Sequence, residues 1–241
     1  WAATDEIWYY SINDFDSDFF ADNISLSPVG VEFDFCAVGM REHIFSPLVG
    51  IYSVYNMLAA ASAASVLGIK GRIAARALSR FCGVPGRMEK IMTKSGVTVI
   101  VDFAHTPDAM KNVISATKQL TAGKVITVFG CGGERDKGKR PEMGKVACAL
   151  SDKVIITSDN PRSENPDEII NDIVAGIKAC ENRTTEPDRK KAIRLAITSA
   201  EKGDTVLILG KGAEEFITAG GKKLPFSDRE TAENIILEKG L

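Results

Sequence analysis

The stretch Asp159-Asn160-Pro161-Arg162 places a carboxylate, an amide and a guanidinium side by side. It follows the apolar residues 154–156, which have the composition of a buried parallel strand. Pro161 fixes its own φ and biases the preceding residue toward extended backbone, so the polar groups leave the chain at fixed angles. Open α/β sheets bind ligands at the carboxyl ends of such strands. The stretch therefore predicts a site where Arg162 forks onto a carboxylate or phosphate. The alternative is a turn with a capping Asp and a solvated Arg.

Three other predicted strands also end in polar or glycine residues. Residues 97–101 run into Asp102 to Asp108, residues 125–129 into Gly130 to Arg140, and residues 205–209 into Gly210 to Glu215. The carboxyl ends of parallel strands share one edge of a sheet, so we expect these segments to converge on one ligand.

The segment after residues 125–129 is the richest in charge. Its glycines allow backbone amides to approach an anion, and a positive field is expected from Arg135, Lys137, Lys139 and Arg140. It matches most of a Walker A loop, but Arg140 stands where Ser or Thr would bind Mg²⁺. The dinucleotide fingerprint G-x-G-x-x-G fails as well, because Arg135 occupies its third glycine. The alternative interpretation is a solvated basic loop.

Single residues at these strand ends have two interpretations each. His105 is expected to contact a ligand or serve structure, because no matched partner makes it a general base. Asp102 is either a metal-proximal or sugar-binding carboxylate or the cap of a turn. Glu214 is either a carboxylate for an amine or a residue at a helix start. Among the cysteines only Cys131 falls in the crevice, and we expect it to pack.

The spacing of apolar residues predicts the elements that position these groups. Helices over residues 107–120, 141–150, 166–179 and 188–200 alternate with the four strands, which indicates an α/β fold with a Rossmann-like, mostly parallel sheet flanked by helices. Upstream, period-two alternation predicts a strand over 31–35, followed by helices over 54–67 and 72–81. The Gly/Pro-rich link at 82–86 is the expected boundary between domains 1–82 and 83–241.

Composition excludes several classes of protein. The chain has 241 residues, 44% hydrophobic, with a net charge of -2, which argues against a nucleic-acid footprint over the whole surface. No apolar run is long enough to cross a bilayer. Five cysteines without a C-x-x-C pair and only two histidines predict reduced thiols and no metal site. The chain begins with Trp rather than Met, so we expect it to be a fragment or a processed product.

Several segments taken in order resemble the Mur ligases of peptidoglycan synthesis, and among them the diaminopimelate-adding members. They are Val84-Pro85-Gly86-Arg87-Met88-Glu89, Asp102 to Asp108, Gly130 to Pro141, Asp159 to Arg162, and Gly210-Lys211-Gly212. The resemblance implies the end of the central α/β ATPase domain followed by the C-terminal amino-acid-binding domain. The ATP loop, the carbamylated lysine and the UDP-binding domain of the family would lie upstream.

The resemblance also implies an activity. The family is a cytoplasmic group of ATP-dependent ligases that use Mg²⁺. The diaminopimelate-adding members join meso-diaminopimelate to UDP-N-acetylmuramoyl-L-alanyl-D-glutamate through an acyl phosphate, with no nucleic-acid or membrane partner. As a fragment, the chain is expected to be inactive alone. The open alternatives are a lysine-adding member, a folylpolyglutamate synthase, against which Asp159 to Arg162 argues, and a stand-alone ligand-binding domain.

By the same resemblance, individual residues acquire roles. Arg162 and Arg135 would clamp the distal carboxylate of diaminopimelate, and Glu214 would meet its distal ammonium. The full substrate set would be Arg135, Asp159, Asn160, Pro161, Arg162, Gly210 and Glu214, and the residues near ATP would be Asn56, Arg87, Asp102 and His105. Two positions depart from the family pattern, because Ala213 replaces a usual His and Ser53 a usual Asn.

Overall fold

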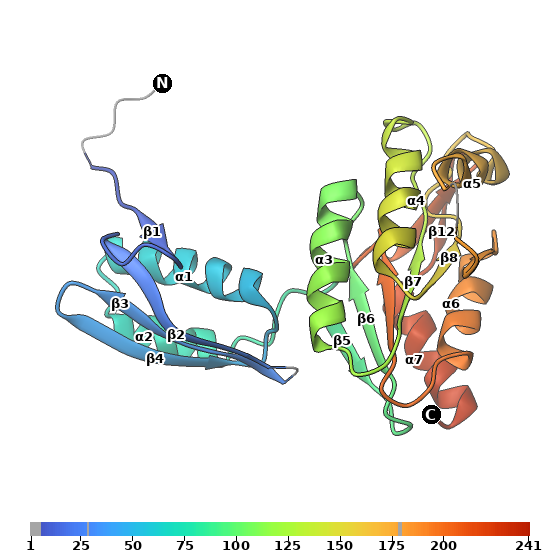
Figure 1. Ribbon diagram of the computed structural model, residues 1–241. Helices are drawn as coiled ribbons and strands as arrows, with labels where there is room; N and C mark the ends of the chain where they lie inside the picture. Colours follow the sequence, from blue (N-terminus) through green and yellow to red (C-terminus); the bar gives the residue numbers. More distant parts are fainter. Residues whose placement is uncertain (1–5, 28, 178–179) are drawn as a thin grey trace. The chain divides into compact units, whose positions relative to one another are not determined.

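The computed structural model describes residues 6–27, 29–177 and 180–241 of the protein (Figure 1). The chain divides into two compact units, Trp1–Gly83 and Val84–Leu241. The division falls inside the Gly/Pro-rich link at residues 82–86. The first residue, on which the expectation of a fragment rests, lies outside the described residues.

The first unit is a sheet with helices on one face. Its strands are β1 (Tyr10–Ser11), β2 (Phe19–Ser27), β3 (Gly30–Ala37) and β4 (Met40–Ser46), and its helices are α1 (Ile51–Val66) and α2 (Gly71–Ser79). The strand order is β1-β2-β3-β4, with β1 parallel to β2 and the others antiparallel. The expected alternation holds in β3, because Val31, Phe33 and Phe35 are buried against α1 and α2 while Glu32 is exposed.

The second unit is a mostly parallel sheet with the strand order β5-β6-β10-β7-β8-β9. Its strands are β5 (Glu89–Met92), β6 (Thr98–Asp102), β7 (Val125–Phe129), β8 (Lys153–Ile156), β9 (Arg183–Thr185) and β10 (Thr205–Leu209). Its helices are α3 (Pro107–Leu120), α4 (Lys139–Leu150), α5 (Pro166–Ala175), α6 (Arg189–Thr198) and α7 (Asp228–Lys239). A hairpin of β11 (Phe216–Ala219) and β12 (Lys222–Pro225) stands between β10 and α7. Only β5 runs antiparallel to its neighbour within the described part of this sheet.

Helices cover both faces of this sheet. Residues of α3, α4 and α5, such as Ile114, Met143 and Ile173, pack on one face, whereas Ile193 of α6 and Ile235 of α7 pack on the other (Figure 1). The chain leaving β10 goes to α7, on the face opposite to the helices that follow its neighbours β6 and β7. The sheet therefore has a topological switch point at β10, where open α/β sheets form their ligand crevice.

The strand register brings the predicted strand ends to one level. Leu209 pairs with Asp102 across β10 and β6, and Phe129 pairs with Ile156 across β7 and β8. The segments that follow these four strands consequently start side by side at the carboxyl edge of the sheet. The predicted α/β class with a mostly parallel sheet is confirmed.

Several element bounds differ from the predictions. Helix α4 begins at Lys139 rather than Pro141, so that Pro141 is its third residue, and α5 ends at Ala175 rather than residue 179. The predicted end of α5 covers residues 178–179, which lie outside the described residues. The strands β5 and β9 and the hairpin β11–β12 are only three or four residues long, and the sequence pattern did not indicate them.

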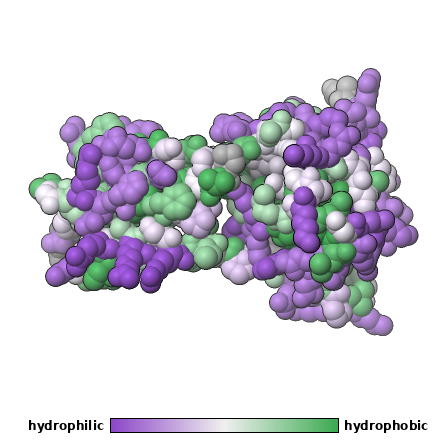
Figure 2. Space-filling model, turned by 90° about the horizontal axis from the view of Figure 1, so that it is seen from below, coloured by the Kyte–Doolittle hydropathy of each residue, from purple (hydrophilic) through white to green (hydrophobic). Residues whose placement is uncertain are grey.

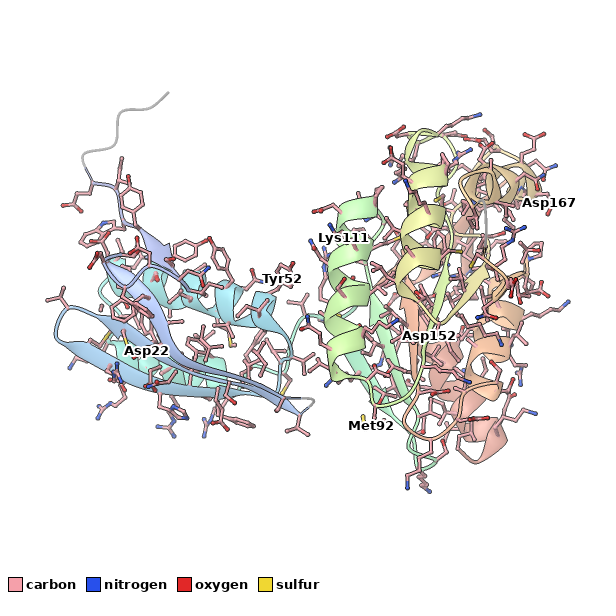
Figure 3. All side chains as sticks on the ribbon, viewed as in Figure 1. Asp22, Tyr52, Met92, Lys111, Asp152 and Asp167 are labelled. Carbon is pink, nitrogen blue, oxygen red and sulfur yellow. The ribbon has the colours of Figure 1, made fainter. Side chains whose placement is uncertain are left out.

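The surface of the second unit is mainly polar. Hydrophilic side chains cover most of its face in Figure 2, with small apolar patches between them. Lys111 on α3 and Asp167 on α5 point away from the sheet and are exposed (Figure 3). Among the described residues, no helix combines the length and apolar character needed to span a membrane.

Candidate functional site

A pocket of about 240 Å³ opens at the carboxyl edge of the second unit's sheet. Segments after β6, β7, β8 and β10 all contribute to it, as their common edge requires. It is lined by Phe103, His105, Gly130, Cys131, Gly132, Arg135, Lys139, Asp159, Asn160, Arg162, Gly210 and Glu214. Protein pockets for drug-sized ligands usually span about 300–1,000 Å³, so this one suits a small polar molecule.

The segments after β7 and β8 are joined through their backbones. The amide of Gly133 donates to the carbonyl oxygen of Asn160 at 2.9 Å. A Cβ at Gly133 would lie 2.0 Å from the carbonyl oxygen of Pro161, and a Cβ at Gly130 would lie 2.3 Å from that of Thr157. Glycine is required at both positions because only hydrogen fits between the two loops.

Arg162 is held by backbone groups on both sides. Its Nη1 donates to the carbonyl oxygen of Gly133 at 2.5 Å, and its amide donates to the carbonyl oxygen of Thr218 in β11 at 2.9 Å. Its φ of 55° is left-handed, a conformation that non-glycine residues adopt rarely. All hydrogen bonds of its guanidinium within the described residues use Nη1. The remaining donors are therefore available to a ligand.

Arg135 and Lys139 complete the positive side of the pocket. No partner for the exposed guanidinium of Arg135 is found in residues 6–27, 29–177 and 180–241. Lys139, the first residue of α4, donates from Nζ to the carbonyl oxygen of His105 at 2.9 Å. Three cationic side chains thus border the same small volume, and they favour an anionic group in the ligand.

Arg140, which was expected to add to this positive field, does not face the pocket. Its side chain is 0% exposed and pairs with Glu164 and Asp172 through Nη1 at 2.9 and 2.8 Å. Lys137 lies 3.5 Å from the same Glu164. Hydrogen bonding from Arg140 is the main reason that the pKa of Glu164 falls to about 2. These cations brace the loop internally, because a buried guanidinium must be paired.

Glu214 forms the negative side of the pocket. Its Oε2 accepts from Lys211 Nζ at 2.7 Å and from Asn160 Nδ2 at 2.8 Å. Burial acts to raise the pKa of Glu214, but the hydrogen bonds from Lys211 and Asn160 outweigh it and hold that pKa below its ordinary value. The alternative of a helix-start glutamate is wrong, because strand β11 follows this residue.

Asp159 is a buried residue that lines the same pocket as Glu214. A buried ion pair lies beneath it. Burial raises the pKa of the Asp159 carboxyl, against the attraction of Arg189 and Lys211. Arg189, at the start of α6, binds Asp228 of α7 in a fork with both distances 2.7 Å, and also donates to the carbonyl oxygens of Ser158 and Leu209. The ion pair therefore ties two helices to the ends of β8 and β10, beneath the pocket.

The segment after β6 joins the link that opens the unit. The carboxylate of Asp102 accepts from the amides of Met88 and Ala104 at 2.8 and 2.7 Å, which favours the turn-cap interpretation over a ligand contact. The guanidinium of Arg87 lies 4.7 Å from the ring centre of Phe103. His105 lines the pocket, and its Nδ1 lies 2.9 Å from the carbonyl oxygen of Phe103.

The thiol of Cys131 is buried and packs, as expected. It lies 3.5 Å from the sulfur of Met143, and burial raises its pKa to about 12, which disfavours the reactive thiolate. The described residues contain no group of three or more His, Cys, Asp or Glu side chains arranged to hold a metal ion.

The structure brings together most of the residues that the sequence singled out for substrate. The pocket is lined by Arg135, Asp159, Asn160, Arg162, Gly210 and Glu214. Pro161 shapes the loop, with its carbonyl oxygen packed against Gly133. Asn56 is an exposed residue of α1 in the first unit. Sequence reasoning missed Lys211 and Arg189 as supporting residues, because nothing local marks a lysine between glycines, or a helix-start arginine, as buried.

A mostly parallel α/β sheet with a pocket of opposed charges at its switch point defines an α/β domain whose pocket suits a small molecule bearing both charges. Comparison with known families agrees with this class. Residues 86–212 match the Mur ligase glutamate ligase domain, and residues 2–64 match the Mur ligase middle domain. The chain belongs to the Mur ligase family.

Two relatives show which ligases of the family this chain is similar to. The chain is 43% identical over 239 residues to a UDP-N-acetylmuramoyl-L-alanyl-D-glutamate–2,6-diaminopimelate ligase from Nostoc sp., covering 98% of this chain and 48% of the relative. It is 43% identical over 224 residues to such a ligase from Clostridium acetobutylicum, covering 92% and 46%. The chain thus spans about half the length of the curated relatives it matches.

Solved structures give the same result. A UDP-N-acetylmuramoyl-L-alanyl-D-glutamate–2,6-diaminopimelate ligase superposes with a TM-score of 0.70 at 33% identity, covering 98% of this chain and 48% of that one. A folylpolyglutamate synthase from Thermotoga maritima has a TM-score of 0.63 at 21% identity, covering 81% and 44%, and shares the fold alone.

Proposed function

We propose that this chain is the amino-acid-binding half of an ATP-dependent ligase that adds meso-diaminopimelate to UDP-N-acetylmuramoyl-L-alanyl-D-glutamate in peptidoglycan precursor synthesis. The observation that carries the proposal is the pocket with Glu214 on one side and Arg162 with Arg135 on the other. Relatives that are 43% identical bear the name of that ligase, which supports the same substrate.

The opposed charges match the far end of diaminopimelate, which carries both an ammonium and a carboxylate. In this proposal Glu214 receives the ammonium and the guanidinium of Arg162 receives the carboxylate in a two-point fork, with Arg135 beside it. Asp159, Asn160, Pro161 and Gly210 shape the pocket between them. The other amine of the amino acid is then left to point out of the pocket toward the acceptor.

ATP would supply the phosphoryl group that converts the acceptor's carboxylate into an acyl phosphate. We propose that Arg87 and His105 lie near the nucleotide, with Asp102 holding their loop, and the resemblance alone supports the same role for Asn56. The part played by this chain is to bind and orient the attacking amino acid, which lowers the entropic cost of the reaction.

Mg²⁺ commonly accompanies nucleotide phosphates and uses few protein ligands. The described residues offer no cluster that fits the ion, so no step is assigned to it here. The use of ATP and a nucleotide-linked acceptor supports a cytoplasmic location for the proposed reaction.

Lysine differs from diaminopimelate by lacking the distal carboxylate. Arg162 would then face no counter-ion, and leaving a desolvated charge unpaired is costly, so lysine is expected to bind much more weakly. The lysine-adding alternative consequently predicts a different partner for this side chain.

Calorimetric titration of the 241-residue chain with meso-diaminopimelate, and separately with L-lysine, tests the proposal. Saturable binding of diaminopimelate alone is the expected result. Preferential binding of lysine would reassign the substrate, and the absence of binding by either would contradict an amino-acid site formed by this chain alone.

A further inference from the structure

We propose that Lys211 is a positioning residue of the amino-acid pocket, which fixes the carboxylate of Glu214 and couples it to the loop that carries Arg162. The inference rests on the proposed function, because it assigns Lys211 to the same pocket. The segment Gly210-Lys211-Gly212 carries part of the family resemblance, but the sequence pattern assigned no role to the side chain of Lys211.

Lys211 is a fully buried lysine at the end of β10. Its side chain is 0% exposed, and its ammonium donates to Glu214 Oε2 at 2.7 Å, to the Phe216 carbonyl oxygen at 2.6 Å and to Asn160 Oδ1 at 3.3 Å. An ammonium has three hydrogens, so these acceptors use them all. Lys211 does not line the pocket, and it therefore acts on a ligand only through its partners.

The first consequence concerns Glu214. Both hydrogen bonds that its side chain receives from described residues end on Oε2, from Lys211 and Asn160. The carboxylate is thereby held in one orientation, and Oε1 is left for a ligand ammonium. A carboxylate fixed before binding loses less entropy when the ligand arrives.

The second consequence links the two charged sides of the pocket. The oxygen Oδ1 of Asn160 accepts from Lys211 and also from the amide of Thr218 in β11, at 2.8 Å. The carbonyl oxygen of Thr218 in turn accepts from the amide of Arg162, and Gly220 donates back to the carbonyl oxygen of Arg162 at 2.7 Å. Lys211 thus anchors a continuous set of contacts that sets the spacing between Glu214 and Arg162.

The third consequence is electrostatic. Three cations act on Glu214: Lys211 on its own loop, Arg162 after β8 and Arg189 of α6. The other charged residues that line the same pocket are Asp159, Arg135 and Lys139. Lys211 is the cation among them that touches the carboxylate. Without the Lys211 ammonium, less would counteract the effect of burial on Glu214. The pKa of Glu214 would then rise instead of lying below its ordinary value.

The test compares three variants of the chain: Lys211→Met, Glu214→Gln and the double variant. The first readout needs no ligand and is the pKa of Glu214, followed by carbon-detected NMR of the side-chain carboxyl. We expect Lys211→Met to raise that pKa by about one unit or more. An unchanged pKa in a folded Lys211→Met chain would overturn the inference.

The second readout is meso-diaminopimelate affinity by calorimetry. Each single variant is expected to weaken binding roughly 10- to 100-fold, the usual effect of losing a hydrogen bond to a charged group. If Lys211 acts through Glu214, the double variant binds little worse than Glu214→Gln alone. Fully additive losses would overturn the coupling, because a merely structural lysine would weaken both backgrounds equally.

The two proposals fail in different ways. No binding by the unaltered chain overturns the proposed amino-acid site, while the NMR titration still decides the role of Lys211. If Lys211→Met does not fold but the double variant does, that rescue supports charge compensation between Lys211 and Glu214. If neither folds, Lys211 serves the fold rather than the pocket, and the inference is wrong.

Discussion

The two charged sides of the pocket are built in different ways. On the acidic side, Glu214 is held by the side chains of Lys211 and Asn160, above the buried pair of Arg189 and Asp228. On the basic side, the guanidinium of Arg162 donates, among the described residues, to the backbone carbonyl oxygens of Gly133 and Asn160. The acidic side is fixed by buried charge, whereas the basic side keeps donors open to solvent.

The difference follows from where the charges lie. A charge taken out of water is costly unless it is paired, and on the acidic side Arg189 pairs with Asp228 and Lys211 pairs with Glu214. On the basic side Arg135 is exposed and Arg162 is half-buried, so these guanidinium groups keep contact with water until a ligand arrives. The comparison indicates that the acidic side is formed before a ligand binds. The basic side selects among ligands, because a ligand without a distal carboxylate leaves Arg162 unpaired.

Removing the buried ion pair between Arg189 and Asp228, which lies beneath the acidic side, should have the largest effect on stability. Arg189→Met leaves Asp228 buried without its partner, and the two side chains are 1% and 0% exposed. We expect a loss of about 3–5 kcal/mol in the free energy of unfolding, measured by urea denaturation. Arg194→Met on the same helix is the control, since its pair with Glu238 is exposed and should change stability by less than about 1 kcal/mol. Equal losses of stability in the two variants would contradict the distinction between the buried and the exposed ion pair.

A change at the basic side should affect selectivity rather than stability. Arg162→Lys removes the planar fork but keeps the charge, so meso-diaminopimelate affinity should fall roughly 10-fold or more while lysine affinity changes little. Calorimetry with both ligands measures the ratio. Arg229→Lys, an exposed residue paired with Glu89 and Glu233, is the matched control. If Arg162→Lys kept the same preference for meso-diaminopimelate over lysine, Arg162 would not be the residue that binds the distal carboxylate.

The junction between the loops after β7 and β8 offers a steric test. A Cβ in Gly133→Ala would lie 2.0 Å from the Pro161 carbonyl oxygen, so the loops must separate, at a cost of about 1–3 kcal/mol. Gly138→Ala, where the nearest atom is a side-chain oxygen of Asp136 at 3.2 Å, should be nearly neutral. Hydrogen exchange of the loop amides, beside thermal unfolding, reports the change. Similar protection in both variants would show that the junction is loose.

The smallest expected effect is a change in how stability depends on pH, and it arises from Glu164, the partner of the buried Arg140. The folded-state pKa of Glu164 is lowered from 4.5 to about 2, chiefly by hydrogen bonding from Arg140. Its contribution is therefore present above pH 4.5 and is lost as the pH falls toward 2. Glu164→Gln should flatten the fall in stability across that window in urea titrations, whereas Glu142→Gln, an exposed control, should retain it. A slope unaffected by Glu164→Gln would mean that other carboxyls govern it.

Much of the fold could be read from local pattern. The helix over Pro107–Leu120 and the strands Val125–Phe129 and Thr205–Leu209 match the predicted ranges, because apolar runs and first-turn prolines are local signals. The short strand Arg183–Thr185 and the hairpin of β11 and β12 gave no such signal, because β9 forms by pairing with β8 and the two hairpin strands form by pairing with each other.

The sequence by itself determined the family, the α/β class and the list of residues that meet at the strand ends. Motif spacing and periodicity are properties of the chain, and parallel strands must present their carboxyl ends together. Only the tertiary structure decided which charges face the ligand. Arg140 and Arg135 lie in one basic run, yet one is buried against Glu164 and the other borders the pocket. Lys211 became a supporting residue for the same reason, because burial and pairing depend on elements distant in sequence.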